Sequence, residues 1–373
     1  MGATDRHGVL RPAVLGRIGA AALLLAALVT GLWMHAGRSV AVANLALAEA
    51  SCSRAPLPTI GGRYGDAVAA NQQGVAVGAA TDATGASHAV LWRSGKVERI
   101  AAGTAGSVAV ALNARGEVVG TARSDTDAVG WAWSGGVTTA LKAEHGRVAV
   151  PSAINDRGLI VGALAESAAA HGTVPNDDEN EQAAWWASAR AAPRELSPLP
   201  GDDGGYAFAV DNRGRIAGMS AGTRFRPVVW AAPGASPSAL QDLGGGYAAV
   251  RTLSDSGVAA GDAVGTDGTD HPVMWDPAGR IVDLGLPAGA KSGQARAILR
   301  NGAIIGTAEL PLPGGGVRSQ AVQWLAPRHL LLLPSAGTGG ASSAAGATDA
   351  NGFVGNVMDP DGGRHPVRWQ CGK

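Results

Sequence analysis

Seven copies of one pattern of apolar and polar positions run along the chain between residues 67 and 369. In each copy a run of small and apolar residues ends at a position that is usually Asn or Asp, and a Gly follows three positions later. A second Gly, a variable stretch and an apolar segment that ends on Trp complete the copy. The first copy reads AVAANQQGVAVG…HAVLW and the fourth reads AFAVDNRGRIAG…RPVVW. Because internal repeats decide the fold class, this period is the basis for interpreting the chain.

The spacing of the copies predicts their fold. The glycines that follow the polar position are separated by 42, 42, 56, 43, 45 and 50 residues, and four-stranded propeller blades recur at roughly 40 to 50 residues. We therefore expect an all-β chain that forms a seven-bladed β-propeller of four-stranded blades. The long third step contains an acidic insertion at residues 166–182, which is expected to be a surface loop. The turn glycines are Gly74, Gly116, Gly158, Gly214, Gly257, Gly302 and Gly352.

Each copy divides into four predicted strands, which the first copy illustrates. Residues 67–71, 75–78, 88–92 and 96–100 form apolar or β-branched segments, and short turns that contain Gly or polar residues separate them. Asn71 occupies the first position of the first turn. Its side chain is expected to accept a hydrogen bond from the backbone two residues on, which holds the turn.

Side-chain size orients a blade within the ring. The first strand is rich in Ala, which fits the crowded central axis, whereas a terminal Trp suits the wider gaps between neighbouring blades. We expect all seven tryptophans in the core between blades, and the Gly of each second strand beneath a neighbouring aromatic ring. The tryptophans are Trp92, Trp133, Trp186, Trp230, Trp275, Trp324 and Trp369.

The two ends of the repeat region complement each other. The last copy stops after its third strand at Trp369, and residues 57–60 before the first copy resemble a fourth strand. We predict a ring closed by this N-terminal strand, which completes the C-terminal blade and leaves no exposed sheet edge between the ends. Cys52 and Cys371 flank the seam, so a disulfide is expected there, with two unrelated thiols as the alternative. It would close a loop of about 320 residues and contribute roughly 5 kcal/mol by chain entropy.

The chain before the repeats has a different composition. Arg6, Arg11 and Arg17 precede an uncharged apolar run at residues 18–34, a pattern typical of a signal peptide or a membrane-anchor helix. Cleaved or not, this apolar helix places the propeller outside the cytoplasm, either secreted or anchored to the cell membrane. The predicted parts are a basic region at 1–17, the apolar helix at 18–34, a linker at 35–55 and the propeller at 56–373.

The charge of the chain excludes one class of partner. Lys plus Arg and Asp plus Glu both number 30, and no basic stripe is interleaved with aromatic residues. Nucleic acid is therefore not expected as a partner, and membrane contact is expected only through the N-terminal helix. We expect a monomer that binds an extracellular glycan, peptide or protein.

The repeat motif resembles a known family. The order N-x-x-G-x-V-V-G, then H-A-x-L-W, then D-L-G is similar to the HAF repeats, probable extracellular repeats named for a His-Ala-Phe tripeptide. The tripeptide position carries His in three copies, at His88, His271 and His365. The resemblance covers about residues 57 to 369. It implies an exported β-propeller and supplies no catalytic residues.

Loop positions give a candidate binding site. In a four-stranded blade, the blade-linking loops and the loops between the second and third strands emerge on one face. We expect the three tyrosines of the chain in the blade-linking loops, where amphipathic rings beside glycines suit a sugar or a peptide. Packing of each Tyr at a blade junction is the alternative. The candidate ligand-binding residues are Tyr64, His145, Asp202, Asp203, Tyr206 and Tyr247.

An enzyme is the competing interpretation. Glu144, His145, Asp202 and Asp203 could converge on the same face as the acid and base groups of an extracytoplasmic hydrolase or lyase. The sequence contains no nucleophile elbow, phosphate-binding loop or zinc-ligand spacing. We therefore predict no catalytic residue, cofactor or metal site, and favour a binding module.

Two further groups have a structural interpretation. The histidines at the tripeptide position are expected to donate hydrogen bonds to a neighbouring loop rather than to bind a metal. Asp-rich loops such as residues 81–85 and 359–363 are expected to form ordinary turns. Calcium binding is the alternative for these loops, because Ca²⁺ takes six to eight oxygen ligands.

Overall fold

The described part of the chain is entirely β-structure. The computed structural model describes residues 52–103, 106–123, 128–144, 146–166, 181–335, 340–347, 352–359 and 362–372. These residues form 28 strands, and within these ranges there is no helix, so none that could span a membrane. The predicted basic region, the apolar helix, residues 35–51 of the linker and most of the third-copy insertion lie outside the described residues.

The repeats form four-stranded antiparallel units in the predicted strand order, and we call each unit a set, numbered by its copy. Set 1 contains β2 (Gly61–Ala70), β3 (Ala76–Asp82), β4 (Ser87–Arg93) and β5 (Lys96–Arg99), and each strand pairs with the next. The remaining strands are β6 (Ser107–Leu112), β7 (Val118–Arg123), β8 (Ala128–Ser134) and β9 (Val137–Ala140) in set 2; β10 (Val148–Ile154), β11 (Ile160–Ala165), β12 (Gln182–Trp186) and β13 (Pro193–Glu195) in set 3; β14 (Gly204–Val210), β15 (Ile216–Ala221), β16 (Phe225–Trp230) and β17 (Pro237–Ala239) in set 4; β18 (Gly244–Leu253), β19 (Ala259–Gly265), β20 (Asp270–Trp275) and β21 (Ile281–Asp283) in set 5; β22 (Ser292–Ile298), β23 (Ile304–Pro311), β24 (Val317–Ala326) and β25 (His329–Leu332) in set 6; and β26 (Ala341–Ala347), β27 (Gly352–Met358), β28 (Arg364–Cys371) and β1 (Cys52–Pro56) in set 7.

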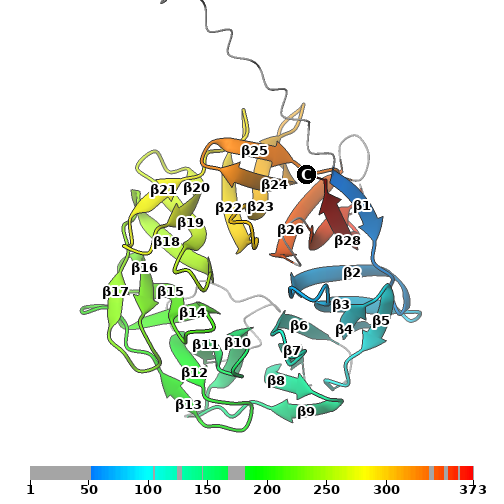
Figure 1. Ribbon diagram of the computed structural model, residues 1–373, viewed down its shortest axis with the longest axis horizontal. Coiled ribbons are helices and arrows are strands. Elements are labelled where there is room, and N and C mark those ends of the chain that lie inside the picture. The colour runs from blue at the N-terminus through cyan, green and yellow to red at the C-terminus, as the bar shows by residue number, and fades with distance from the viewer. Residues whose placement is uncertain are drawn as a thin grey trace, which may run out of the picture. The chain divides into compact units, whose positions relative to one another are not determined.

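The sets are arranged around a common centre, with their first strands innermost (Figure 1). Sets 4 and 5 form one eight-stranded sheet, because β16 pairs in parallel with β18 at Phe225 and Tyr247. The apolar core lies between neighbouring sets; Leu91 of set 1, for example, shares a buried cluster with Leu112 and Trp131 of set 2. The predicted division of each copy into antiparallel strands is confirmed.

β1 completes set 7 at the seam between the two ends of the repeat region. It pairs antiparallel with β28, with Cys52 opposite Cys371 and Arg54 opposite Trp369. The two cysteines form the predicted disulfide and are 319 residues apart in the sequence. They occupy the place of the turn that joins the third and fourth strands in set 1.

The position of β1 corrects the prediction that residues 57–60 form the closing strand. The closing strand lies about five residues earlier, so the end of the predicted linker belongs to the sheet. Leu57 adds one backbone hydrogen bond, from its N–H to the carbonyl oxygen of Pro366 at 2.9 Å, and Ile60 forms an isolated bridge to Asp82. The intervening Pro58 has no backbone N–H and cannot extend the ladder. Residues 57–60 therefore lead from set 7 into set 1.

Every first strand contains a β-bulge, which the sequence interpretation did not include. The pairing of β2 with β3 skips one residue between Ala67 and Ala69, and the same shift recurs in all seven sets. A methyl group on the opposing second-strand Gly would lie 1.9 to 2.1 Å from a first-strand carbonyl oxygen. Backbone crowding therefore requires each Gly, although a tryptophan ring also approaches Gly120 and Gly355. The bulge residues are Val68, Val110, Ser152, Phe208, Arg251, Arg296 and Ala345.

Six of the seven repeat tryptophans are buried between sets, with at most 1% of their surface exposed. Each donates its indole N–H to a carbonyl oxygen in the segment that leads into its own set, as Trp92 does to Pro58 at 2.7 Å. Trp133 is the exception, because it is partly exposed and Trp131 in the same strand is buried in the core between sets 1 and 2. The prediction holds only in part for Trp133, which packs partly buried against the same cluster, whereas the Trp131 ring lies over Gly120 within it.

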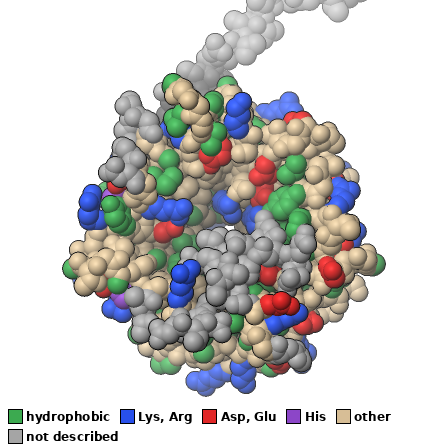
Figure 2. All heavy atoms as spheres, turned by 180° about the vertical axis from the view of Figure 1, so that it is seen from behind, with side chains coloured by type: hydrophobic (Ala, Val, Ile, Leu, Met, Phe, Trp, Pro, Cys, Tyr) green, Lys and Arg blue, Asp and Glu red, His purple; other side chains and the backbone are tan. Residues whose placement is uncertain are grey.

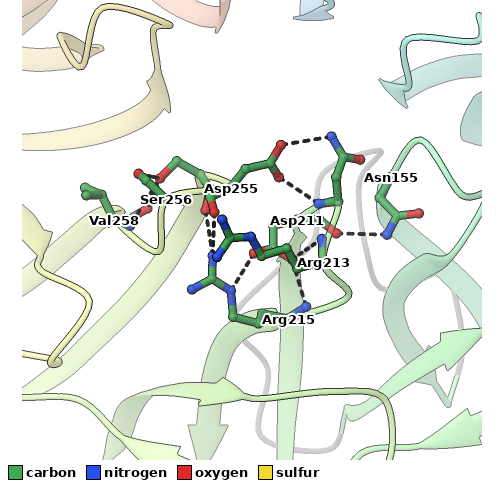
Figure 3. A network of polar contacts seen from close by, with 9 residues as sticks. Asn155, Asp211, Arg213, Arg215, Asp255, Ser256 and Val258 are labelled. Atoms are coloured by element: carbon green, nitrogen blue, oxygen red, sulfur yellow. Dashed lines mark hydrogen bonds and ion pairs between the residues drawn. The ribbon is translucent and has the colours of Figure 1, made fainter.

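Side-chain hydrogen bonds connect neighbouring sets at the first turns. The turn Asn accepts a bond from the backbone N–H two residues on, as predicted, and its amide also donates to the next set. Set 4 has Asp211, which cannot donate; its carboxylate accepts a bond from Arg215, and Arg215 donates to the carbonyl oxygen of Ser254 in set 5 (Figure 3). The amide bonds run from Asn71 to Asn113, from Asn113 to Asn155 and from Asn155 to Asp211, at 2.8 to 3.0 Å.

Candidate functional site

A cavity of about 730 Å³ lies at the centre of the sets, where the first strands begin. Its wall has two different halves, because sets 5, 6, 7 and 1 supply charged and hydrogen-bonding groups and sets 2 to 4 supply mainly apolar ones. One face of the molecule is hollowed near its centre, with basic and acidic side chains around the hollow (Figure 2). The polar half includes Arg251, Gln294, Arg296, Glu309, Ser319, Asn356, Arg364 and Asp66, and the apolar half includes Val108, Val110, Pro151 and Phe208.

The seven bulge residues lie where this cavity meets a second one; we call the two cavities together the channel and these seven residues the waist. A second cavity, of about 760 Å³, lies on the other side of them, and the residues that line both cavities are these seven. A bulge adds one residue to the strand and redirects its side chain, which explains why the position faces the channel in every set. Five members of the waist are uncharged, whereas Arg251 and Arg296 place two guanidinium groups in adjacent sets.

Contacts on several sides fix the guanidinium of Arg251. Its Nε donates to Asp262 Oδ1 at 2.9 Å, and the Asp262 side chain is fully buried. The guanidinium carbon lies 4.4 Å from the centre of the Phe208 ring, a cation–π distance. The same group also donates to the Tyr247 hydroxyl. Arg251 is thus held in one orientation at the waist by three neighbours.

Near the waist, burial and neighbouring charges act in opposite directions on the pKa of the Asp270 carboxyl. Burial raises the pKa of Asp270 to about 6, the negative charge of Asp262 adds to the rise, and Gln294, Arg251 and Arg296 oppose it. The Gln294 amide donates to Asp270 Oδ2 at 3.2 Å and accepts a hydrogen bond from Arg296. The other oxygen, Oδ1, is buried and has no hydrogen-bond partner within the described ranges. Asp270 therefore holds Arg296 indirectly, through Gln294.

At the seam, set 1 and set 7 meet through a second polar group. Asp66 accepts a hydrogen bond from the Asn356 amide, and its other oxygen forms an ion pair with Arg364 at 2.7 Å. Asn356 Oδ1 also accepts a bond from the backbone N–H of Ala67 at 2.8 Å. These side chains line the cavity and tie the first set to the last.

The structure places the three tyrosines within first strands, not in blade-linking loops. Tyr206 is fully buried, stacks on Phe208 at 4.6 Å and donates its hydroxyl to the carbonyl oxygen of Val150 at 3.3 Å. Tyr247 supports Arg251, and Tyr64 is half-buried beside a smaller pocket of about 450 Å³. The placement in loops was wrong because the first strands of sets 1, 4 and 5 extend farther toward the linking segments than the repeat pattern indicated.

The predicted acidic residues also lie apart from the cavity. The side chain of Asp202 is 7% exposed; it accepts a hydrogen bond from Ser220 Oγ at 2.6 Å and forms an ion pair with Arg226 at 2.8 Å. Asp203 and Glu144 are exposed, and neither lines the cavity. His145 lies outside the described residues. The structure thus does not bring Asp202 and Asp203 together with the tyrosines around one pocket.

The histidines of the tripeptide position contact aspartates of the loops, as expected. His88 Nε2 lies 2.9 Å from Asp82 Oδ2, and His365 Nε2 lies 3.1 Å from Asp359 Oδ2. Hydrogen bonds from the Thr84 hydroxyl and from His88 hold the pKa of Asp82 well below its usual range. Across the described ranges, no group of three or more His, Cys, Asp or Glu residues is arranged to hold a metal ion. In set 5, His271 lies 3.7 Å from Asp267 and 3.4 Å from Asp283.

The residues that sequence reasoning missed are Arg251 and Arg296. The available signal was the repeat register, because in six copies the bulge residue lies three positions before the first residue of the turn. Val, Ser, Phe or Arg occupies that position in a strand whose neighbours are mostly small. A charged residue at a position that faces the axis is a candidate for ligand contact.

Comparisons with solved structures identify the fold. The chain is similar to puromycin hydrolase, with 17% identity and a TM-score of 0.50 over 83% of this chain and 52% of that one. It is also similar to a puromycin-hydrolyzing peptidase of Mycobacterium tuberculosis, with 14% identity and a TM-score of 0.50 over 82% of this chain and 51% of that one. The chain thus spans about half the length of these proteins. No family model matches the chain, and neither does a curated protein sequence. At these identities the likeness concerns the fold alone, which is a β-propeller.

Proposed function

We propose that the chain is an exported, monomeric β-propeller of seven blades with HAF-type repeats, closed by β1, that binds a small ligand in the central cavity. The seven sets and the pairing of β1 with β28 support the architecture. Export is supported by the basic and apolar start of the sequence and by the disulfide, since disulfides persist in oxidising compartments.

The observation that best supports a binding function is the central cavity, whose wall is polar on one half and apolar on the other. At about 730 Å³ it falls within the range of roughly 300 to 1,000 Å³ that is typical of small-molecule sites. Such sites combine apolar walls with a few fixed polar groups, and Arg251, held by the buried Asp262, is a group of that kind. Arg251 stands on a strand paired with its neighbour and also contacts Tyr247, so its guanidinium is positioned before a ligand arrives.

A ligand screen that includes a blocked channel tests this proposal. The full chain would be screened against glycans, peptides and small organic molecules, together with an Ala345→Trp variant that fills the waist. The expected result is a ligand that binds the natural chain and loses at least about tenfold in affinity to the variant. Ligands that bind both proteins equally, or the absence of any ligand, would contradict a binding site in the channel.

The alternative is an extracytoplasmic hydrolase or lyase acting at the same cavity. The fold is shared with peptidases that hydrolyse puromycin, and Asp66 and Glu309 supply carboxylates to the cavity wall. Glu309→Gln separates the two functions. An enzyme that uses this acid would lose turnover by about 10² to 10⁴, whereas a binding module would change only modestly in affinity.

A further inference from the structure

We propose that the waist binds the carboxylate of an amphipathic organic acid, with the carboxylate at Arg251 and Arg296 and the apolar part against Val68 and Val110. This inference rests on the binding function proposed above and names its ligand class. The ring of bulge residues brings these four side chains to one level of the channel.

The two arginines are the charged members of the waist, and they come from adjacent sets. No carboxylate belongs to the ring of seven. The nearest acidic partner of Arg251, Asp262, is fully buried in the wall behind it. A guanidinium presents several N–H donors in one plane, and this arrangement matches the two oxygens of a carboxylate. Two guanidinium groups thus line the cavity on this side, and the carboxylates of Asp262 and Asp270 lie beside them in the wall.

The guanidinium charges of Arg251 and Arg296 both act on the carboxyl of Asp270. The charges of Arg251 and Arg296 each stabilise the ionised form of Asp270, so both groups lie within electrostatic reach of the same carboxyl. Asp262 holds Arg251 from within the wall, and Gln294, which also lines the cavity, holds Arg296. The pair is thus arranged before a ligand arrives, which reduces the entropy lost on binding.

The opposite side of the waist is apolar. Val68 and Val110 come from sets 1 and 2, across the ring from the arginines, and neither carries a hydrogen-bonding side chain. Ser152, between the two sides, has a buried hydroxyl oxygen with no hydrogen-bond partner in the part of the chain that the structure describes. A ligand with a carboxylate at one end, an apolar body and a single polar substituent would satisfy all three features.

Inorganic phosphate fits this ring less well, although arginine binds both oxyanions. A phosphate ion needs donors on all sides, and the Val side of the waist supplies none. An organic acid instead turns its apolar part to that side and gains burial of roughly 25 cal/mol per Å². The apolar half of the ring therefore favours a carboxylate with a hydrocarbon or aryl body.

Calorimetric titration of the full chain tests the inference, with phenylacetate as the representative acid. Phenylacetamide has the same shape without the charge, and orthophosphate has the charge without the apolar body. We expect saturable binding of phenylacetate, at least about tenfold weaker binding in Arg296→Gln, and weak or no binding of the amide and of phosphate. Arg280→Gln is the matched control, because Arg280 lies on an outer turn of set 5, is 73% exposed and should leave the affinity unchanged.

A second pair of variants separates charge from folding. Val110→Asp and Val110→Asn have nearly the same shape, and the added carboxylate alone should lower the affinity for phenylacetate by a further tenfold or so. Equal binding of the amide and the acid, unchanged affinity in Arg296→Gln, or no saturation by phenylacetate would overturn the inference. If the screen then finds a neutral ligand that loses affinity in Ala345→Trp, the binding function survives and the carboxylate assignment fails.

Discussion

The carboxyl of Asp270 lies between a buried carboxylate and two guanidinium groups. Its pKa is raised to about 6 chiefly by burial, whereas an Asp in an unfolded chain has a pKa of roughly 3.9. At a pH between these two pKa values, Asp270 keeps its proton in the folded protein and loses it in the unfolded chain. The stability that this proton contributes is present at low pH and is lost as the pH rises through about 6.

Asp270→Asn should therefore stabilise the protein above pH 6 and have little effect near pH 4. The Asn oxygen still accepts the bond from Gln294, and no charge is buried. The difference between the folded and unfolded pKa values of Asp270 corresponds to roughly 2.7 kcal/mol, and partial exposure reduces this to about 1 to 2 kcal/mol at pH 8. Urea unfolding of both proteins from pH 4 to pH 8 measures the difference, and a difference independent of pH would contradict this account.

Within each blade, one pair of features determines the shape of the first strand. The bulge places an extra residue on that strand, and the Gly opposite it leaves space for the displaced backbone. The repeat pattern shows the Gly in all seven copies, but the Gly alone does not reveal the bulge. The reason is physical: a strand Gly is compatible with aromatic cover, close backbone approach or a bulge, and the sequence does not distinguish these.

Gly261→Ala tests the link between the Gly and the bulge. Its Cβ would lie 2.0 Å from the carbonyl oxygen of Ala249 and 3.0 Å from the backbone nitrogen of Arg251. Because backbone must move, we expect a loss of about 3 kcal/mol or more in the free energy of unfolding.

Gly268→Ala is the control for Gly261→Ala. Gly268 has φ +78° in an open turn with nothing within 4 Å of its Cβ position, so its substitution should cost about 1 to 2 kcal/mol through the left-handed backbone alone. Equal losses in the two variants, measured by urea unfolding, would show that crowding at the bulge is not decisive.

Across the whole molecule, the seam depends on a short strand. β1 has five residues, four of them exposed, and it is held by its pairing with β28 and by the disulfide. The sequence predicted that an N-terminal strand pairs with the last copy and that a disulfide joins the two, because both ends of the repeat region show what is missing. It placed the strand five residues too late, since the repeat motif specifies the fourth strand less strongly than the first three.

Cys371→Ser should weaken the seam without changing the repeats. The loss of a bond that closes so long a loop is expected to reduce stability by about 2 to 5 kcal/mol. β1 would then detach more often, and trypsin would cleave after Arg54, which pairs with Trp369 in the intact sheet. Thermal unfolding and limited proteolysis measure the two effects. Reduction of the natural protein should reproduce both, and resistance of Arg54 to trypsin in both cases would contradict the account.

The candidate site followed from the sequence much less completely than the architecture. Spacing and strand composition identify blades, because they repeat seven times and every copy reinforces the others. The waist depends on single residues that differ between copies, so repetition gives no support there. Tyr206 and Asp202 looked like surface groups in the sequence, and their burial follows from strand ends and ion pairs that no periodic pattern records.

The side-chain hydrogen bonds between first turns run in one direction, from set 1 to set 5. In set 5 the Ser254 hydroxyl bonds within its own turn, and in set 6 the corresponding residue is Leu299, which has no side-chain donor. Within the described residues, these side-chain bonds between first turns therefore join sets 1 to 5, and none continues from set 5 to set 6. We expect the first turns of sets 5 and 6, whose first strands carry Arg251 and Arg296, to separate more readily than those of sets 1 to 4. This opening would let a ligand enter the channel.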